Sequence, residues 1–485
     1  MRSSASLCRL LICFPACLLL LGCSPSPSTK ETQAVTAAAE KTPLRVLVVD
    51  DSDLAVVIRQ QWQTRSIDDE LDVRTATRHE LQSARRLSAD VVVFPARWMG
   101  ELVERELIQP VPEAMLQPAG DDPPLVKLDD LLPTVRQCDV SWGRKVYAVT
   151  LGSPQLVLLY RPDLFEKLQL SPPATWANYQ AAVVKLADRK SLGELAPPAD
   201  KPWHSALEPT AAGWAGITLL ARAASAVRSE SQLYALFDPD QMSARIASPP
   251  FVTVVRELSE AVQTSEAADR QLTPEDVRKA FFAGECGLAI TWPSAAGALE
   301  STVPVAFAEL PGRAETFSFK TSEWVKKGAG VNTRTSLCGV SGRLAAVTRE
   351  ARRSRHAFQL LAWLSGNEAA QAISRTSPHT TLFRHPQISN PALWVSDGAS
   401  SDAGIQYAQV LESSFSRAGW MPVARLPGVD AYHAALDTAV WKAISNPDQT
   451  GEALTNAAQE WDLITKRHDV SRQRRAYQRS LGNDF

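Results

Sequence analysis

Apolar runs alternate with amphipathic stretches in the N-terminal part of the chain. Residues 44–51 read LRVLVVDD, and apolar side chains recur at helical spacing over Asp53–Gln63. Leu71–Ala76 and Asp90–Pro95 are two further β-prone runs. Strands that alternate with helices predict parallel pairing with right-handed crossovers. We therefore expect this part to form a doubly wound sheet.

The apolar run Leu156–Tyr160 lies between turn signals and predicts a strand that is buried on both faces. A Gly/Pro break at Gly152–Pro154 separates it from the β-prone run Lys145–Thr150. A short helix, Leu164–Leu168, is predicted next, and Thr175 is suited to cap the helix after it. We expect the chain to cross from one sheet to another at this break.

Helical periodicity dominates most of the remaining chain. It predicts helices over 175–188, 211–224, 250–265, 273–284, 354–364, 432–444 and 450–465. The residues after Thr465 are basic, and the simplest interpretation is a solvated helix end, where cations are favoured. Docking of this basic tail to lipid headgroups or to a permease is an alternative.

The opening VLVVDD also resembles the start of a response-regulator receiver domain. A receiver needs a phosphoacceptor aspartate at the end of its third strand, where this chain has Phe94–Pro95. We reject the receiver hypothesis for that reason.

Length and charge limit the classes of protein that fit. The 485 residues, of which 45% are hydrophobic, are too many for a single core and predict two or three domains. The formal net charge of −2 argues against a general nucleic-acid binder, which is expected to be strongly basic.

The N-terminus has the pattern of a secretory leader. Arg2 and Arg9 precede the apolar segment Leu10–Leu21, which is too short for a membrane-spanning helix. The segment ends in Leu-Leu-Gly-Cys, which resembles a bacterial lipobox with Cys23 as the lipidated residue. We expect a signal peptide over 1–22 and a flexible tether over 23–42. An ordinary leader cleaved elsewhere and an uncleaved anchor are alternatives.

Three cysteines remain after the leader and Cys23, namely Cys138, Cys286 and Cys338. Their number is odd and their spacing fits no metal motif, so buried thiols are the simplest interpretation. One disulfide in an oxidising compartment, with Cys286–Cys338 as the candidate, is the alternative.

No catalytic motif stands out in the sequence. It contains neither G-x-S-x-G nor H-E-x-x-H, and no phosphate-binding glycine loop. His379 and His385 flank Arg384, an arrangement more typical of a loop than of a metal site. The chain instead has 13 tryptophans, whose faces can cover the apolar faces of sugars. We expect no enzyme activity, no cofactor and no metal.

Several motifs in order resemble the bacterial extracellular solute-binding proteins of family 1, the maltodextrin-binding-like receptors of ABC importers. They are Tyr147-Ala148-Val149, then Tyr160-x-x-Asp163-Leu164-Phe165, Pro173-Ala174-Thr175-Trp176, AFFAGECGLAITWP over 280–293 and VPVAFAELPG over 303–312. The sequence departs from the family at Thr150, at Arg161–Pro162 and at Asn178.

The resemblance implies an α/β, two-lobe periplasmic-binding-protein fold of type II-like form, with a doubly wound sheet in each lobe and hinge crossings between them. We expect lobe 1 over 43–149 plus 304–364 and lobe 2 over 150–303 plus 365–470, followed by a basic tail over 471–485. The crossings are expected near Val149–Ser153 and Val303–Ala306, the latter returning the chain to lobe 1.

The resemblance and the strand ends together imply a set of ligand-binding residues. Strand ends supply Asp51, Ser52, Phe94, Arg97 and Trp98, whereas the family motifs supply Glu208, Trp214, Trp292, Ser294, Tyr432 and His433. Thr210 stands where the family has a stacking aromatic residue, so Trp214 is its candidate substitute. For every tryptophan in the set, packing in the core or at the rim is the alternative.

The implied function is a lipid-anchored, monomeric receptor that captures a small solute, most simply a carbohydrate, and delivers it to an ABC permease. One alternative is a binding protein for another solute, such as a polyamine, a phosphorylated compound or a chelate. A sensory or structural lipoprotein with the same fold is a second alternative, and an enzyme is the third.

Overall fold

The computed structural model describes residues 43–65, 70–229, 232–296, 300–328, 334–395 and 400–483. The predicted leader, the tether and Cys23 lie outside these residues. In the ranges that are described, no helix has both the length and the apolar character needed to cross a bilayer.

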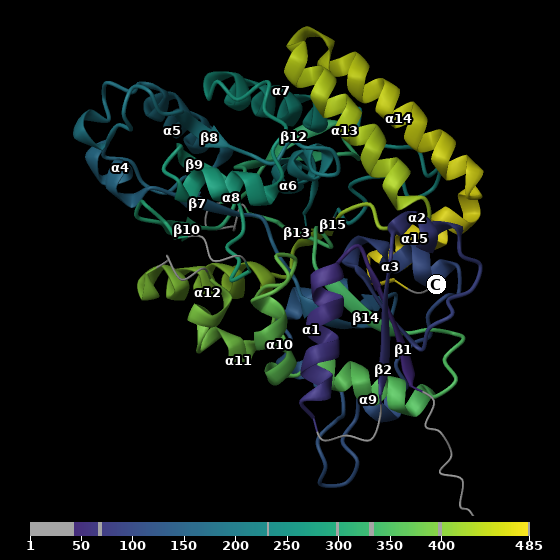
Figure 1. The fold of residues 1–485 in the computed structure, drawn as a ribbon. Helices are drawn as coiled ribbons and strands as arrows, with labels where there is room; N and C mark the ends of the chain where they lie inside the picture. Colours follow the sequence, from purple (N-terminus) through teal and green to yellow (C-terminus); the bar gives the residue numbers. More distant parts are fainter. Residues whose placement is uncertain are drawn as a thin grey trace, which may run out of the picture. The chain divides into compact units, whose positions relative to one another are not determined.

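A five-stranded sheet contains the predicted N-terminal strands, in the order β2-β1-β3-β14-β6. Figure 1 labels three of its strands, β1, β2 and β14. Its strands are β1 Leu44–Val49, β2 Leu71–Ala76, β3 Val91–Pro95, β6 Val149–Gly152 and β14 Arg343–Val347. Strand β1 pairs in parallel with β2 and β3, as predicted, whereas β14 is antiparallel to β3 and to β6.

Helices cover both faces of this sheet because successive side chains of a strand point to opposite faces. They are α1 Ser52–Gln63, α2 Arg78–Ser83, α3 Met99–Glu104, α9 Ser354–Leu364 and α10 Asn367–Ser374. Val91 and Val93 of β3 pack in one apolar cluster with α1 and α9, whereas Val92 and Phe94 pack in another with α3. The prediction of a doubly wound sheet is confirmed.

A second sheet has four strands in the order β10-β7-β9-β8. They are β7 Val157–Tyr160, β8 His204–Leu207, β9 Cys286–Thr291 and β10 Ala306–Ala308. Every residue of β7 is buried, as its apolar run predicts. The helices of this region are α4 Pro162–Lys167, α5 Trp176–Ala187, α6 Ala215–Val227, α7 Pro249–Thr264, α8 Pro274–Phe282, α11 His385–Ile388 and α12 Ser401–Phe415. The side chain of Thr175 caps α5 by accepting from the backbone N–H of Asn178, as predicted.

The chain leaves the first sheet after β6 and enters the second at β7, so the first crossing lies where the Gly/Pro break predicts it. The second crossing does not lie near Val303–Ala306. Strand β10 stays in the second sheet, because Ala306, Phe307 and Ala308 pair antiparallel with β7. The chain rejoins the first sheet only at β14. The other domain boundaries stay predictions.

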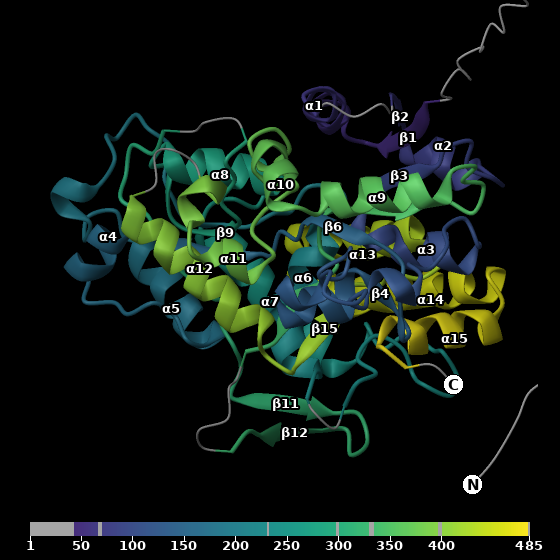
Figure 2. The same cartoon turned by 90° about the horizontal axis from the view of Figure 1, so that it is seen from below.

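The C-terminal region is helical, with α13 Val429–Ser445, α14 Thr450–Arg467 and α15 Val470–Ser480. Helices α13 and α14 lie side by side (Figures 1 and 2). The predicted basic tail is mostly helix α15, and its Ala476 and Tyr477 are buried. Arg479 of this helix forms an ion pair with Glu104 at 2.8 Å. Part of the tail therefore packs against the protein rather than standing in solvent.

Small two-stranded elements complete the fold. They are β4 Ser141–Trp142 with β5 Lys145–Val146, β11 Glu315–Ser318 with β12 Glu323–Lys326, and β13 Ser336–Cys338 with β15 Trp420–Pro422. Figure 2 shows the β11–β12 pair apart from both main sheets.

The disulfide joins Cys138 to Cys338, with 6.6 Å between their Cα atoms, and not Cys286 to Cys338. Cys286 opens the buried strand β9 in the second sheet and is a buried thiol. Sequence separation gave no indication of this pairing, because the two bonded cysteines lie 200 residues apart. The alternative of one disulfide is right, but its candidate partner is wrong.

Candidate functional site

A cavity of about 190 Å³ lies at the edge of the five-stranded sheet where its parallel strands end. Its lining residues are Asp50, Arg78, Pro95, Arg97, Trp214, Val340, Ser341, Arg343 and His379. Asp50 follows β1, and Pro95 ends β3 directly opposite Arg343, the first residue of antiparallel β14. Ligands of open α/β sheets bind beyond such strand ends.

Trp214 brings the second region of the chain to this cavity. It precedes α6 in the segment that follows β8 of the four-stranded sheet. Its ring lies 5.5 Å from that of Trp292, at a tilt of 45°. Trp292 is buried, and its Nε1 donates to the carbonyl oxygen of Pro378 at 2.9 Å. Trp214 therefore supplies an aromatic wall of the cavity, and the ring of Trp292 packs against that of Trp214.

An acidic hollow of about 610 Å³ adjoins the cavity and shares Asp50 and His379 with it. Its other lining residues are Asp51, Ser52, Asp53, Thr75, Ala76, Thr77, Glu80 and Pro378. Carboxylate and hydroxyl groups of this kind accept hydrogen bonds from hydroxyl groups. The cavity and the hollow together offer a continuous polar surface beyond β1 and β2.

Asp51 has structural partners besides its place in the hollow. Its Oδ1 accepts from the backbone N–H of Leu54 at 3.0 Å and so caps α1. Its Oδ2 accepts from the hydroxyl of Ser377 at 2.7 Å and lies 3.2 Å from Nε of Arg343. Ser52, the next residue, is exposed. Asp51 thus ties β1, β14 and the 376–384 loop together at the rim of the hollow.

Two of the three arginines in the cavity have carboxylate partners. Arg78 forms an ion pair with Asp50 and lies 3.9 Å from Asp430. Arg343 pairs with Asp51 and donates to the carbonyl oxygen of Asp50 at 3.1 Å. Burial lowers the pKa of Arg343 from its ordinary value.

Arg97 is held differently from the other two arginines. Among the residues that the structure describes, its guanidinium has no carboxylate within 4.0 Å, and its Nη1 reaches the carbonyl oxygen of Gly213 at 3.5 Å. Burial, and next the positive charge of Arg78, lowers the pKa of Arg97 to about 10. Arg97 remains a cation at neutral pH.

The remaining predicted site residues lie in the core or in other networks. Phe94 and Trp98 are buried, and Nε1 of Trp98 donates to Asp430 at 3.3 Å. The hydroxyl of Tyr432 is 2.8 Å from that of Thr465 in the core. Ser294 is buried and accepts from the backbone N–H of Ala296 at 3.1 Å. None of these four side chains lines the cavity.

Glu208 is also outside the cavity, in a buried cluster of the second region. Its carboxylate pairs with Arg222, whose Nε donates to Oε2 at 2.8 Å. The hydroxyl of Tyr179 donates to Oε1 at 2.8 Å. This cluster uses both carboxylate oxygens, so the structure gives Glu208 a packing role at this place.

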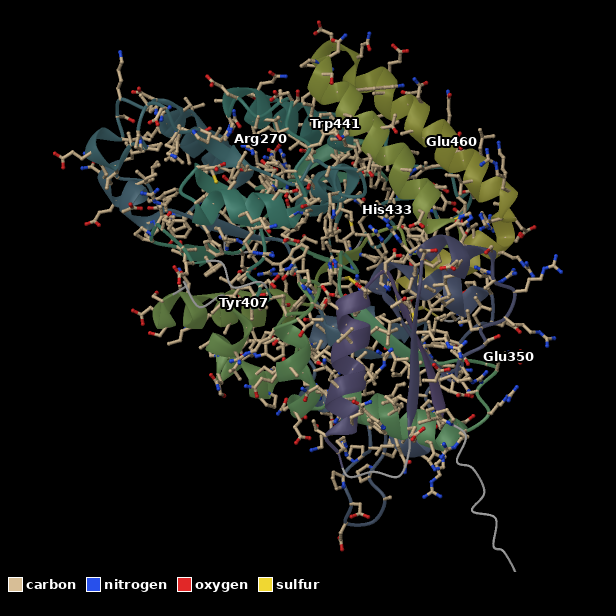
Figure 3. All side chains as sticks on the ribbon, viewed as in Figure 1. Arg270, Glu350, Tyr407, His433, Trp441 and Glu460 are labelled. Atoms are coloured by element: carbon tan, nitrogen blue, oxygen red, sulfur yellow. A yellow bond between two sulfur atoms is a disulfide. The ribbon has the colours of Figure 1, made fainter. Side chains whose placement is uncertain are left out.

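His433 lies on α13, the helix that also carries Trp441 (Figure 3). The ring is buried, and its Nε2 is 3.1 Å from the carbonyl oxygen of Ala424, so Nε2 carries the proton. Burial, and next the charge of Arg97, lowers the pKa of His433 to about 3. His433 therefore stays neutral above that pH and stands near the cavity without lining it.

Seven lining residues were not among the predicted ones, namely Asp50, Arg78, Pro95, Val340, Ser341, Arg343 and His379. Asp50 and Arg78 follow β1 and β2, so the strand-end rule that selected Asp51 and Arg97 was sufficient to find them. Arg343 and His379 come from distant segments that only the folded sheet brings to this edge.

Two histidines, the buried His433 and the half-buried His379, predict that acid destabilises the protein. Burial, and next the charge of Arg343, lowers the pKa of His379 to about 3, as burial does for His433. Histidines of the unfolded chain take up protons near pH 6.5, so between pH 6.5 and 3 the unfolded state binds more protons. The free energy of unfolding should fall as pH is lowered through this range, by up to about 1.4 kcal/mol per pH unit for each histidine.

Urea denaturation at pH 7 and pH 5 tests this expectation. His379→Gln and His433→Gln should each reduce the difference in the free energy of unfolding between pH 7 and pH 5. His385→Gln, at an exposed position, is the matched control and should leave it unchanged. If the free energy of unfolding differs by the same amount between pH 7 and pH 5 in the wild type and in all three variants, His379 and His433 are not the cause of the acid destabilisation.

Solved structures of binding proteins share this fold. A ribitol-bound ABC transporter solute-binding protein of Agrobacterium radiobacter K84 has a TM-score of 0.64 at 16% identity, over 87% of this chain and 98% of that one. Maltose-bound MalE3 of T. maritima has a TM-score of 0.61 at 18% identity, over 87% of this chain and 100% of that one. A D-mannitol-bound ABC transporter solute-binding protein of Agrobacterium vitis S4 has a TM-score of 0.60 at 16% identity, over 88% of this chain and 99% of that one. The likeness confirms the predicted two-lobe α/β fold.

The model of one family, described as bacterial extracellular solute-binding protein, matches residues 67–384 of this chain. The match includes both main sheets except β1, and it contains every cavity-lining residue except Asp50. Proteins of this description act outside the cytoplasm and bind solutes rather than transform them, which is the class that the sequence motifs predict. The chain belongs to the bacterial extracellular solute-binding protein family.

Proposed function

We propose that this protein captures a sugar or polyol in the cavity beyond β1 and β3 and delivers it to an ABC permease. The observation that supports this most directly is the meeting of Trp214, from the segment after β8, with polar residues at the edge of the five-stranded sheet. Relatives in fold were solved with ribitol, maltose and D-mannitol.

The lining residues suit such a solute chemically. The face of Trp214 covers the apolar C–H face of a sugar, while Asp50 and Ser341 accept or donate hydrogen bonds to its hydroxyls. A single water needs about 10–15 Å³ of such space, so a cavity of about 190 Å³ has room for a small solute. Of the predicted site residues, Arg97 and Trp214 line the cavity, and Asp51 and Ser52 line the adjoining hollow.

Capture depends on contacts with both regions of the chain at once. A ligand shifts a conformational equilibrium only by its differential affinity for the two states. A solute that contacts Arg97 after β3 and Trp214 after β8 gains both sets of contacts only when the two sheets stand close together. Its presence should favour a closed form, which the permease then recognises.

We further propose that lipidated Cys23 anchors a monomeric receptor to the bacterial membrane and that residues 23–42 act as its tether. The lipobox-like Leu20-Leu21-Gly22-Cys23 supports this, as does the Pro-, Ser- and Thr-rich sequence that follows it. A chain of about 20 flexible residues has a typical reach of roughly 25 Å. That distance leaves the body free to turn toward a permease in the same membrane.

Thermal unfolding with ribitol, D-mannitol, D-glucose and maltose tests the proposal. At a solute concentration 100 times the Kd, binding should raise the free energy of unfolding by about 2.7 kcal/mol. Trp214→Ala should weaken the binding of the stabilising solute at least tenfold, because the aromatic wall is lost.

Trp441→Ala is the matched control, because Trp441 lines a different hollow, along α13, with Thr438 and Gln449. Solute affinity should be unchanged in that variant. A solute whose affinity falls with Trp441→Ala and not with Trp214→Ala would contradict the proposed site. Absence of stabilisation by every solute class, charged ones included, would favour a sensory or structural role.

A further inference from the structure

We propose that the solute carries an anionic group, a carboxylate or a phosphate, and that Arg97 binds it together with Arg78 and Arg343. This inference rests on the proposed function and specifies its substrate class. Three arginines and one carboxylate, Asp50, line the cavity. Arg78 pairs with Asp50 and Arg343 with Asp51, so the unpaired positive charge in the cavity is that of Arg97, and a site for a neutral sugar does not require it.

Arg97 carries the inference because its charge is the least compensated. The guanidinium has five N–H donors, and the one acceptor bonded to them within the described part of the chain, the carbonyl oxygen of Gly213, lies 3.5 Å from Nη1. A carboxylate or phosphate accepts two parallel hydrogen bonds from a guanidinium, and such bonds are the strong ones.

The acidic side chains near Arg97 already have other partners. Asp437 accepts from the backbone N–H of Gly213 at 2.6 Å and from that of Gly216 at 2.7 Å. Asp430 accepts from Nε1 of Trp98 and lies 3.9 Å from Arg78. Neither carboxylate lies within 4.0 Å of Arg97 in the described part of the chain. An incoming anion therefore meets a cation with no ion-pair partner among these residues, although the charges of Asp430 and Asp437 act on Arg97 from a greater distance.

The pKa of His379, the histidine in the cavity, is lowered by burial and by the same arginines. His379 lines the cavity, and its Nδ1 is 3.4 Å from the hydroxyl of Ser341. Besides burial, the charges of Arg343 and Arg97 lower the pKa of His379 to about 3. A neutral imidazole beside the arginines can donate or accept a hydrogen bond without adding charge.

The neighbouring acidic hollow suggests what the rest of the solute is. It shares Asp50 and His379 with the cavity and adds Asp51, Ser52 and Glu80. Carboxylates accept hydrogen bonds from hydroxyls and repel a second anionic group. The two ends together fit a sugar acid or a sugar phosphate whose anionic group faces the arginines and whose hydroxyls face the hollow.

Isothermal titration calorimetry with matched probes tests the inference. The neutral probes are D-glucose and D-sorbitol, and the anionic probes are D-gluconate, D-glucuronate and glucose 6-phosphate. Inorganic phosphate alone measures the contribution of the anion without the hydroxyls. At least one anionic probe should bind about 30-fold or more tightly than its neutral counterpart, and inorganic phosphate should bind more weakly than that probe.

Variants assign the difference to Arg97. Arg97→Gln should reduce the affinity for the anionic probe about 30-fold or more and leave that for neutral probes unchanged. Arg97→Lys should retain part of the preference, because it keeps the charge but not the fork of donors. Arg349→Gln is the control: it removes the same charge from an exposed ion pair with Glu106 and should leave every affinity unchanged.

The outcomes separate this inference from the proposed function. Equal affinity for neutral and anionic probes in the wild-type protein overturns the inference and leaves sugar capture intact, and this comparison needs no variant to fold. An anion preference that persists in Arg97→Gln overturns the role of Arg97. Absence of binding by neutral and anionic probes alike contradicts both the inference and the proposed function.

Discussion

Glu208→Leu is expected to lower the free energy of unfolding by about 3–5 kcal/mol. The carboxylate of Glu208 and the guanidinium of Arg222 form an ion pair whose side chains are both 2% exposed. Arg222 also lies over the ring of Trp176, 4.3 Å from its centroid. Removal of the carboxylate leaves a buried cation without its partner, which costs more than the pair itself contributes.

Urea denaturation of two variants measures this effect. The double variant Glu208→Leu/Arg222→Met is the control, because it removes both charges at similar volume and should recover most of the loss. A loss below about 1 kcal/mol in the single variant would show that Glu208 is not a buried structural partner. Solute affinity of the folded fraction should stay as in the wild type, since Glu208 does not line the cavity.

Trp292→Ala is the second change with a large expected effect, a loss of about 3–5 kcal/mol in the free energy of unfolding. Trp292 follows β9, is 2% exposed, and donates from Nε1 to the carbonyl oxygen of Pro378. The 376–384 loop that it holds places His379 in the cavity and Ser377 against Asp51. The substitution therefore removes a core side chain and the support of one wall of the site.

Binding separates this effect from a simple loss of stability. Trp292→Ala should weaken solute binding even at temperatures where the variant is fully folded, because Trp214 loses the ring that packs against it. Trp292→Phe keeps an aromatic ring without the indole donor and should lose less stability and less affinity. Unchanged affinity in folded Trp292→Ala would contradict its supporting role.

The parts of the fold with a local signal were predictable from sequence. Strands β1, β2, β3 and β7 and helices α1, α5, α9, α13 and α14 correspond to runs whose periodicity or caps are visible in the chain. The crossing after β6 follows a Gly/Pro break that interrupts two β-prone runs. Local patterns are informative here because burial imposes a period of two on half-buried strands and of 3.6 on helices.

Pairing between distant segments was not predictable in the same way. Strand β10 has three residues, and nothing in them indicates whether they pair with β7 or return to the first sheet. Cys138 and Cys338 are 200 residues apart, so their contact depends on the folded chain. In both cases the wrong expectation came from choosing a partner without tertiary information.

The site residues, too, were predictable where a local signal selected them and not where the folded chain decides their contacts. Asp51, Ser52, Arg97 and Trp214 were predicted from strand ends or motif position, and all four line the cavity or the hollow. Phe94 shares the strand-end signal, but its side chain points into the core with α3. Glu208 and Tyr432 occupy family motif positions, yet the polar group of each side chain is hydrogen-bonded to a buried neighbour and not to the cavity. Residue type and position do not reveal which side of the backbone faces the solute.

The location of a bound solute tests the central claim most directly. A crystal structure of the protein with the solute that stabilises it most should show that solute between Arg97 and Trp214, within hydrogen-bonding distance of groups beyond β1 and β3. A solute found instead in the hollow along α13, beside Trp441, or an empty cavity at saturating concentration, would contradict capture at the edge of the five-stranded sheet.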